Sequence, residues 1–391
     1  MKSTKEIFLK LLLLFGSIVF SLVLCEVGLR LISPGYSPMS LDIYRLDGQG
    51  VLGMRPNLTR RHLTAEWDVA VTLNADGLRD RDQPLNGNGG TILAVGDSYA
   101  FGWGVELADT FLYRVEEALR PEAVRVVKAG IPGTGTSDQL LWLQHYGPRF
   151  QPGLIIVCFC VGNDFVDVQK GGVPGQFIVK DGLMEKKAMD GKPPSWWKTV
   201  INKVKRSSLL GQRVAELVWT YERRIAAQQR QHAGLRARDP WLWEFYKVHL
   251  RPAPPETRQA FELTLQALDD IHQWCEQRQV PMLLLAIPRS IQIYDWELER
   301  WKQSFKVQTE ELDIDQPQRV LAEWATNEHV LLCDLLPAFR LYAKEHPKER
   351  LFFYPDSHMN ANGHRLTASL LADSLKRNKI RPRLQDASKA N

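Results

Sequence analysis

Apolar residues occur along this chain both in continuous runs and in segments with helical spacing. The alternation between the two patterns predicts the fold class. Five apolar runs predict strands, at residues 91–95, 124–127, 154–162, 281–288 and 329–336. The run at 154–162 is apolar throughout, which is typical of a parallel strand covered on both faces. Segments with helical spacing lie between the runs, as at 109–120 and 136–146. The pattern predicts an α/β protein, a three-layer α/β/α sandwich around a parallel sheet of about five strands.

The same pattern divides the chain into parts. The predicted parts are an N-terminal membrane anchor (1–33), a small β-rich lead-in (34–90), the main domain (91–376) with a helical insertion (about 166–255), and a basic tail (377–391). The insertion interrupts the strand–helix alternation with charged helical sequence, so we expect it over the strand ends. Two interpretations remain for its aromatic and basic cluster, a membrane-surface helix or a solvated helix that packs its tryptophans on the core. The cluster consists of Trp196, Trp197, Lys198, Lys203, Lys205 and Arg206.

The N-terminus combines lysines with a long apolar run. Lys2, Lys5 and Lys10 precede or interrupt an apolar stretch that extends to Cys25, and its length is about that of a bilayer core. Lysines on the N-terminal side predict that this end is cytoplasmic and that the rest of the chain is extracytoplasmic, in the periplasm. A cleaved signal peptide is the alternative, but no small-x-small cleavage site follows the run. The sequence therefore favours a single-pass inner-membrane anchor.

Composition excludes one class of partner and leaves the compartment open. The chain of 391 residues has a net charge of +5, and its basic and acidic residues are interspersed. It lacks the basic stripe with which a nucleic-acid-binding protein contacts phosphates. Cys158 and Cys160 alternate along one predicted strand, which is poor disulfide geometry, so buried thiols are expected. We therefore predict a membrane-associated protein that binds no nucleic acid; its oligomeric state is not predicted.

Polar residues follow three of the predicted strands, at the edge where open parallel sheets bind ligands. Ser98 lies at a strand-to-helix turn, where a serine is exposed as a nucleophile requires, although a plain turn cap is the alternative. Gly133 lies in a glycine-rich loop, which favours a backbone N–H aimed at an oxyanion over a simple tight turn. Asn163 can donate its side-chain amide to the same oxyanion, or serve only as a turn residue.

Asp356 and His358 stand two positions apart, just before the last predicted helix. In an extended segment their side chains would point to the same side, roughly 6.6 Å apart along the chain. The carboxylate could then fix the tautomer of the imidazole while the other ring nitrogen faces a serine. An ordinary loop histidine is the alternative. We expect His364, in the helix start, to be structural, and we predict no metal and no other cofactor, because no further cluster has metal-ligand spacing.

At these positions the sequence resembles the SGNH (GDSL) hydrolase superfamily. The matching motifs are, in chain order, Gly96-Asp97-Ser98, Gly133, Gly162-Asn163-Asp164, and Asp356 with His358. The resemblance covers residues 91–375 apart from the insertion, and it implies a flavodoxin-like sheet and ester hydrolysis through an acyl-serine. The α/β-hydrolases fit less well, because the chain lacks the final glycine of their G-x-S-x-G motif.

The resemblance also implies a role for each site residue. Ser98 would be the nucleophile, His358 the general base, and Asp356 the residue that orients the imidazole. The oxyanion would be held by the N–H groups of Ser98 and Gly133 and by the side chain of Asn163.

The last motif departs from the usual family pattern. In the family the aspartate stands three positions before the histidine, where this chain has Pro355, and Asp356 is only two positions before. This shorter spacing is similar to that in acetyl-handling proteins of bacterial exopolysaccharide assembly.

Two classes of function follow from these features. The first is an anchored serine esterase that acts on an ester-bearing small molecule or an acylated glycan, such as an O-acetylated cell-envelope or exported carbohydrate. An O-acetyltransferase with the same triad is a version of this class. The second is a catalytically silent scaffold of an envelope assembly. The complete set of nucleophile, base, orienting acid and oxyanion donors favours the enzyme.

Overall fold

The structure is a computed structural model. It describes residues 4–32, 41–64, 66–82, 89–168, 177–180, 182–186, 208–211, 213–214, 245–354 and 356–383. These residues fall into two compact units. The first comprises the described residues within Met1–Leu41, Arg60–Asp68 and Ala188–Gln231, and the second comprises the others.

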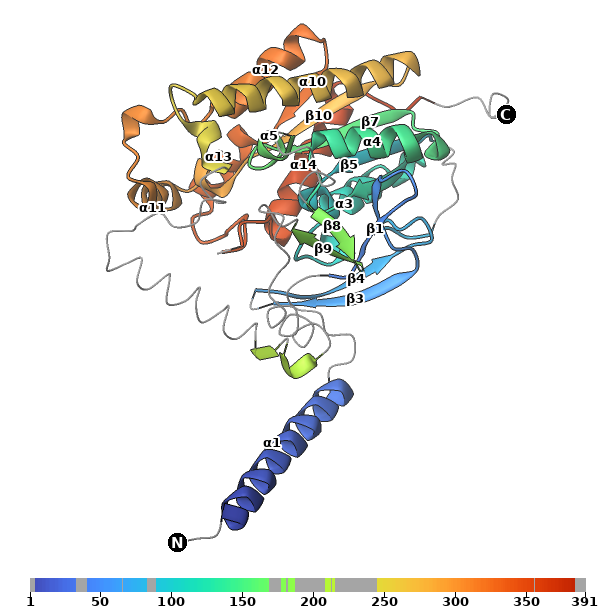
Figure 1. Ribbon diagram of the computed structural model, residues 1–391. Coiled ribbons are helices and arrows are strands. Elements are labelled where there is room, and N and C mark those ends of the chain that lie inside the picture. Colours follow the sequence, from blue (N-terminus) through green and yellow to red (C-terminus); the bar gives the residue numbers. More distant parts are fainter. Residues whose placement is uncertain are drawn as a thin grey trace. The chain divides into compact units, whose positions relative to one another are not determined.

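A five-stranded parallel sheet lies at the centre of the second unit (Figure 1). Its strands are β5 (Thr91–Gly96), β6 (Arg125–Gly130), β7 (Leu154–Cys160), β10 (Met282–Ile287) and β11 (Leu331–Asp334). Their spatial order is β6-β5-β7-β10-β11, and every neighbouring pair is parallel. This is the flavodoxin-like order, in which the chain reverses direction across the sheet between β5 and β7. The predicted α/β class and the five-stranded parallel sheet are confirmed.

The strands are buried on both faces, which explains why their sequences are apolar without alternation. In β5, Ile92 and Ala94 belong to a core cluster on one face, while the intervening Leu93 and Val95 are equally buried. Side chains of successive strand residues point to opposite faces. Both faces must therefore be covered by helices.

Helices supply that cover on each side (Figure 1). On one face α3 (Phe111–Ala118) packs against α14 (Ala361–Arg377), and on the other α4 (Thr136–Tyr146) packs against α10 (Pro255–Gln277). The remaining helices of this unit are α2 (Ser98–Phe101), α5 (Asp164–Asp167), α11 (Asp295–Phe305), α12 (Gln316–Asn327) and α13 (Leu336–Glu345). The observed α4 has the predicted bounds 136–146. Helix α3 begins later than predicted, because the Thr110 hydroxyl accepts a hydrogen bond from the Tyr113 N–H and caps it.

Six short strands lie outside the central sheet. They are β1 (Tyr44–Leu46), β2 (Leu52–Met54), β3 (Leu58–Leu63), β4 (Asp68–Leu73), β8 (Phe177–Lys180) and β9 (Leu183–Lys186), and they form three two-stranded sheets. The first four fall in the predicted lead-in. β8 and β9 form an antiparallel hairpin inside the predicted helical insertion, which its charged sequence did not indicate. The tryptophan and lysine cluster of that insertion, Trp196 to Arg206, lies outside the described residues.

The first unit contains the long N-terminal helix α1 (Thr4–Ile32). Its segment Glu6–Ile32 has a mean hydropathy of 2.6 and is not buried by other parts of the chain, so it is long and apolar enough to cross a membrane. A signal sequence would have the same properties. Near its end the Glu26 carboxylate accepts hydrogen bonds from the Ser208 hydroxyl and the Leu210 N–H, both at 2.9 Å. A short stretch of the insertion thus contacts the end of α1.

Candidate active site

Three adjacent strands end at the same edge of the sheet, and each is followed by one of the predicted site residues. Gly96 at the end of β5 lies between Gly130 of β6 and Cys158 of β7. Ser98 follows β5 directly, and Asn163 follows β7. The strands β5 and β7 flank the point where the chain reverses direction across the sheet, which is where doubly wound sheets bind ligands.

The short helix α2 holds Ser98 at its first position. The Asp97 carboxylate accepts a hydrogen bond from the Tyr99 N–H at 2.9 Å and caps the helix. Asp97 thus has the capping role that was an alternative for this motif, while the Ser98 hydroxyl stays available. Gly130 allows the helix to lie against β6, because a Cβ atom there would come within 2.2 Å of the Phe101 nitrogen. The turn therefore places a partly exposed serine at the sheet edge.

Ser98, His358 and Asp356 form a hydrogen-bonded row. The His358 Nε2 atom lies 2.8 Å from the Ser98 Oγ, and the His358 Nδ1 atom is hydrogen-bonded to the Asp356 Oδ1. The His358 side chain is 22 % exposed, so a ligand can reach it. A proton on Nδ1 that is held by the carboxylate leaves Nε2 free to accept the serine proton.

The backbone between Asp356 and His358 is not extended, in contrast to our expectation. Ser357 has a φ of +78°, in the left-handed region, so the chain turns sharply and both side chains come to one side through the turn. The Tyr99 hydroxyl donates a 2.8 Å hydrogen bond to the Ser357 carbonyl, and the His358 N–H donates to Asp356 Oδ1 at 3.2 Å. Tyr99 thereby ties the residue after Ser98 to the turn that carries the histidine, which sequence spacing alone did not indicate.

The environment of His358 adjusts its proton affinity. Burial lowers the pKa of the imidazole, whereas the charge and the hydrogen bond of Asp356 raise it. The raising effects are the larger in total, so the pKa of His358 lies above its ordinary value of 6.5. The charge of Asp97 acts in the same direction and that of Arg289 opposes it. A histidine with a raised pKa is a stronger base when neutral, which suits it to accept a serine proton.

Two backbone N–H groups, those of Ser98 and Gly133, follow the adjacent strands β5 and β6 at this edge of the sheet. Gly133 has a φ of +81°, a conformation that favours glycine, and lies exposed in the loop after β6. Within the described ranges, no hydrogen bond occupies the N–H of Gly133 or that of Ser98. Neighbouring N–H donors of this kind can stabilise a developing negative charge on oxygen.

The side-chain amide of Asn163 is hydrogen-bonded to two carboxylates. Its amide nitrogen donates to Asp97 Oδ2 at 2.9 Å and more weakly to Asp167 Oδ2 at 3.4 Å. Burial raises the pKa of Asp97, while the hydrogen bond from Asn163 opposes this. Asp97 therefore both caps α2 and orients the amide, a second role that the sequence did not reveal. A ligand oxygen at this amide nitrogen would replace the longer contact to Asp167.

A buried arginine supports the turn that follows α2. The Arg79 guanidinium donates to the carbonyl oxygens of Gly102 (2.6 Å), Val105 (2.7 Å) and Phe101 (3.2 Å). Burial lowers its pKa to about 10, so it remains charged at neutral pH. The turn carries Trp103, whose ring centroid lies 6.1 Å from that of His358. Sequence reasoning missed Arg79, because its partners are backbone carbonyls that leave no pattern in the sequence.

The other candidate histidine has the structural role expected for it. His364 is buried in α14, accepts a hydrogen bond from the Phe111 N–H at 3.2 Å and stacks on the Phe111 ring. Burial lowers its pKa to about 3. Over the part of the chain that the structure describes, no group of three or more His, Cys, Asp or Glu side chains is placed to bind a metal ion.

A flavodoxin-like sheet that carries a hydrogen-bonded serine, histidine and aspartate at its carboxyl edge defines the class of this protein, an ester hydrolase. The model of the GDSL-like lipase/acylhydrolase family matches residues 94–366, so the chain belongs to that family. The resemblance of its motifs to the SGNH (GDSL) superfamily is thus confirmed.

Solved structures with similar folds are distant in sequence. The acetyl xylan esterase AlAXEase is 13 % identical, with a TM-score of 0.40, and the match covers 73 % of this chain and 99 % of that one. A catalytic mutant of an acetylxylan esterase from Geobacillus stearothermophilus is 15 % identical, with a TM-score of 0.40 and coverage of 75 % and 96 %. TesA is 13 % identical, with a TM-score of 0.36 and coverage of 73 % and 98 %. No curated protein sequence gives a significant match.

Proposed function

We propose that the protein is a serine esterase in which Ser98 attacks the acyl carbonyl, His358 accepts its proton, and Asp356 orients the imidazole. The observation that carries this proposal is the hydrogen-bonded row itself, with 2.8 Å between Ser98 Oγ and His358 Nε2 and a carboxylate on Nδ1. Nucleophile and base within hydrogen-bond distance, with the base held by a third group, is the arrangement that activates a serine.

The reaction proceeds in two halves. The Ser98 oxygen bonds to the acyl carbon as its proton passes to His358 Nε2, and the same proton then goes to the departing alcohol oxygen. Water next attacks the acyl-serine and gives a proton to Nε2. That proton then passes to the departing Ser98 Oγ as the bond to the acyl carbon breaks and the carboxylic acid is released. In both halves the carbonyl oxygen becomes negative, and the N–H groups of Ser98 and Gly133 with the Asn163 amide stabilise it.

As substrate we propose an O-acetyl ester on a cell-envelope or exported carbohydrate. The short spacing of Asp356 and His358 supports this, since it resembles that of acetyl-handling proteins of exopolysaccharide assembly. An aromatic pair supports it too: Trp296 is 42 % exposed, and its ring contacts that of the partly exposed Tyr354 edge to face at 5.1 Å. Tyr354 stands two positions before Asp356, and tyrosine and tryptophan side chains are enriched at binding interfaces.

As location we propose the inner membrane, with α1 as an uncleaved anchor and the hydrolase domain in the periplasm. The segment Glu6–Ile32 is apolar and is not buried by other parts of the chain, which supports an anchor. The lysines at its start, Lys2 and Lys5, support a cytoplasmic N-terminus.

Turnover of p-nitrophenyl acetate by Ser98→Ala tests the assignment of the nucleophile. Without the hydroxyl no acyl-serine forms, and we expect kcat to fall by at least about 10³-fold. Ser369→Ala, a change at an exposed position of α14, is the matched control and should keep wild-type turnover. Unchanged turnover in Ser98→Ala would reject the proposal.

Acetate release with and without a glycan acceptor separates hydrolysis from O-acetyl transfer, because a transferase releases less free acetate when the acceptor is present.

A further inference from the structure

A positively charged side chain lies at the same sheet edge, and the proposed reaction does not use it. Arg289 follows β10, whose last residue, Ile287, pairs with Cys160 at the end of β7. Its side chain crosses directly over Gly162, where a Cβ atom would come within 2.5 Å of the Arg289 Cδ. Its Nη1 donates to the Gly162 carbonyl at 3.3 Å. Arg289 therefore packs against the residue that precedes the oxyanion donor Asn163.

The guanidinium of Arg289 lies over two aromatic rings. Its central carbon lies 5.0 Å from the ring centroid of Tyr246 and 5.6 Å from that of Phe245. Such stacking fixes the plane of the guanidinium and leaves its edge available for hydrogen bonds. The side chain is partly exposed.

Among the described residues, no carboxylate forms an ion pair with Arg289. Burial raises the pKa of Glu297 and the charge of Arg289 only opposes this; the Glu297 carboxylate accepts a hydrogen bond from the Ser290 hydroxyl at 2.5 Å rather than from Arg289. Only one of the five guanidinium N–H groups donates to a described acceptor, the Gly162 carbonyl. The charge of Arg289 also acts on His358, which places it within electrostatic reach of the reacting atoms.

We propose that Arg289 binds a carboxylate on the alcohol part of the substrate, so that the preferred substrate is an acylated acidic glycan. This inference rests on the proposed esterase function. A planar guanidinium that lies over aromatic rings, with most of its N–H groups unpaired among the residues that the structure describes, matches the two oxygens of a carboxylate. Because Arg289 packs against the residue before Asn163, a carboxylate bound by Arg289 would lie next to the sugar whose ester is cleaved. Arg289 is thus a specificity-determining residue.

Direct binding tests this without turnover. The Ser98→Ala variant is titrated calorimetrically with an acetylated oligogalacturonide and with the same oligosaccharide after reduction of its carboxyl groups. We expect the acidic ligand to bind about 10- to 100-fold more tightly, as a charge-assisted pair predicts. Adding Arg289→Gln should remove this preference, and Arg289→Lys should keep part of it, because lysine retains the charge but not the planar edge.

A matched change at the other end of the sheet controls for net charge. Arg120→Gln removes one exposed positive charge before β6 begins and should leave the preference for the acidic ligand as it is. The inference is wrong if Ser98→Ala binds both ligands equally, or if Arg289→Gln retains the preference.

Turnover of 3-acetoxybenzoate and 3-acetoxybenzamide gives a second readout on the full enzyme. Arg289→Gln should lower kcat/KM for the anion relative to the amide by about 10-fold or more, mainly through KM. An equal loss for both would mean that Arg289 stabilises the transition state of every ester, which contradicts a specificity role. Failure of the proposed function would appear separately, as turnover that survives Ser98→Ala.

Discussion

At the scale of single residues, the imidazole of His358 is hydrogen-bonded on both nitrogens, to Ser98 on one side and Asp356 on the other. Burial lowers the pKa of His358, but the charge and hydrogen bond of Asp356 together with the charge of Asp97 outweigh it, so the pKa is raised. Only the neutral imidazole can accept the serine proton. The activity of the wild type should therefore fall as the pH drops through a pKa that lies above 6.5.

Asp356→Asn tests the origin of that pKa. Without the carboxylate charge, burial dominates and the pKa of His358 falls, so the acid limb of the kcat/KM profile should move to lower pH. The value of kcat should also fall by roughly 10²- to 10⁴-fold, because the amide no longer fixes the Nδ1–H tautomer. The pH–rate profile of the two proteins is the measurement. An acid limb that stays in place would show that another group sets it.

The residues of the candidate site differ in how far the sequence could predict them. Ser98 and His358 stand in short motifs that resemble those of the SGNH (GDSL) superfamily, so their contact could be expected although 260 positions separate them. The bend at Ser357 could not, because a positive φ at a non-glycine residue leaves no pattern, and the predicted extended backbone is wrong there. The positions of Arg79 and Arg289 depend on backbone carbonyls and rings that are distant in sequence.

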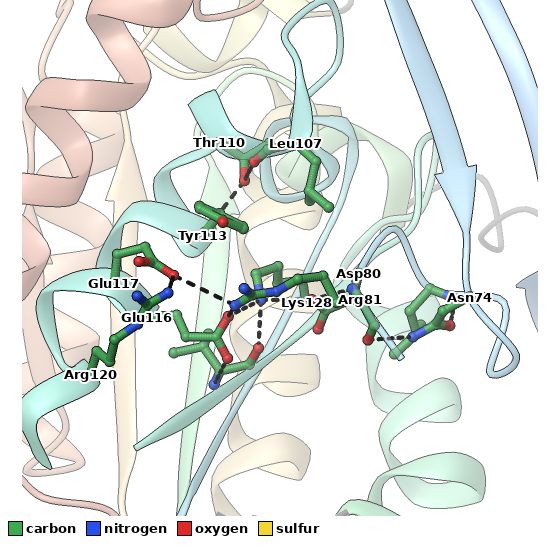
Figure 2. A network of polar contacts seen from close by, with 12 residues as sticks. Asn74, Asp80, Arg81, Leu107, Thr110, Tyr113, Glu116, Glu117, Arg120 and Lys128 are labelled. Carbon is green, nitrogen blue, oxygen red and sulfur yellow. Dashed lines mark hydrogen bonds and ion pairs between the residues drawn. The ribbon is translucent and has the colours of Figure 1, made fainter. Parts of the chain in front are cut away.

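At the scale of elements, a buried ion network joins α3 and β6 to the loop after β4 (Figure 2). Lys128 of β6 donates to Asp80 and to Glu116 of α3, each at 2.8 Å. Burial raises the pKa of Asp80 despite Lys128. Glu116 also accepts from Arg81 and from the Val126 N–H, and these bonds together with Lys128 outweigh burial and lower its pKa. The network fixes α3 against the strand whose far end leads to Gly133.

Lys128→Met should destabilise the protein in a pH-dependent way. Without the lysine, burial raises the folded-state pKa values of Asp80 and Glu116 above their unfolded values. Stability is then retained at low pH, where both are protonated in either state, and lost as the pH rises. We expect a loss of about 3–5 kcal/mol in the free energy of unfolding near pH 8 and a smaller loss near pH 4. Urea denaturation at the two pH values measures this.

The triple variant Lys128→Met, Asp80→Asn, Glu116→Gln is the control. It removes both carboxylates, so the additional pH dependence should disappear. An equal loss of stability at pH 4 and pH 8 in Lys128→Met alone would contradict the assigned charge pairing.

The elements of the sheet were predictable because burial on both faces leaves a strong sequence pattern. The run that forms β7 contains seven consecutive buried residues. The hairpin of β8 and β9 was not predicted, because its segment is charged and its strands are only four residues each. Short antiparallel pairs depend on contacts with the rest of the fold more than on their own sequence.

At the scale of the whole molecule, the apolar helix α1 is the feature that bears on where the protein is located. If Glu6–Ile32 is an uncleaved anchor, the full-length protein should sediment with membranes and resist extraction by alkaline carbonate. A variant that begins at residue 34 should be soluble and keep its turnover of p-nitrophenyl acetate. N-terminal sequencing distinguishes the alternative, since a mature protein that starts after the apolar run would show a cleaved signal peptide.

The central claim is that one serine at the carboxyl edge of the sheet is the nucleophile. The most direct measurement is to treat the wild-type protein with a serine-directed fluorophosphonate and to locate the adduct by peptide mass spectrometry. The account predicts a single adduct on Ser98, with labelling that is slowed in His358→Ala, because the base that activates the hydroxyl is then absent. An adduct on a different serine, or no adduct on a folded protein that hydrolyses esters, would contradict it.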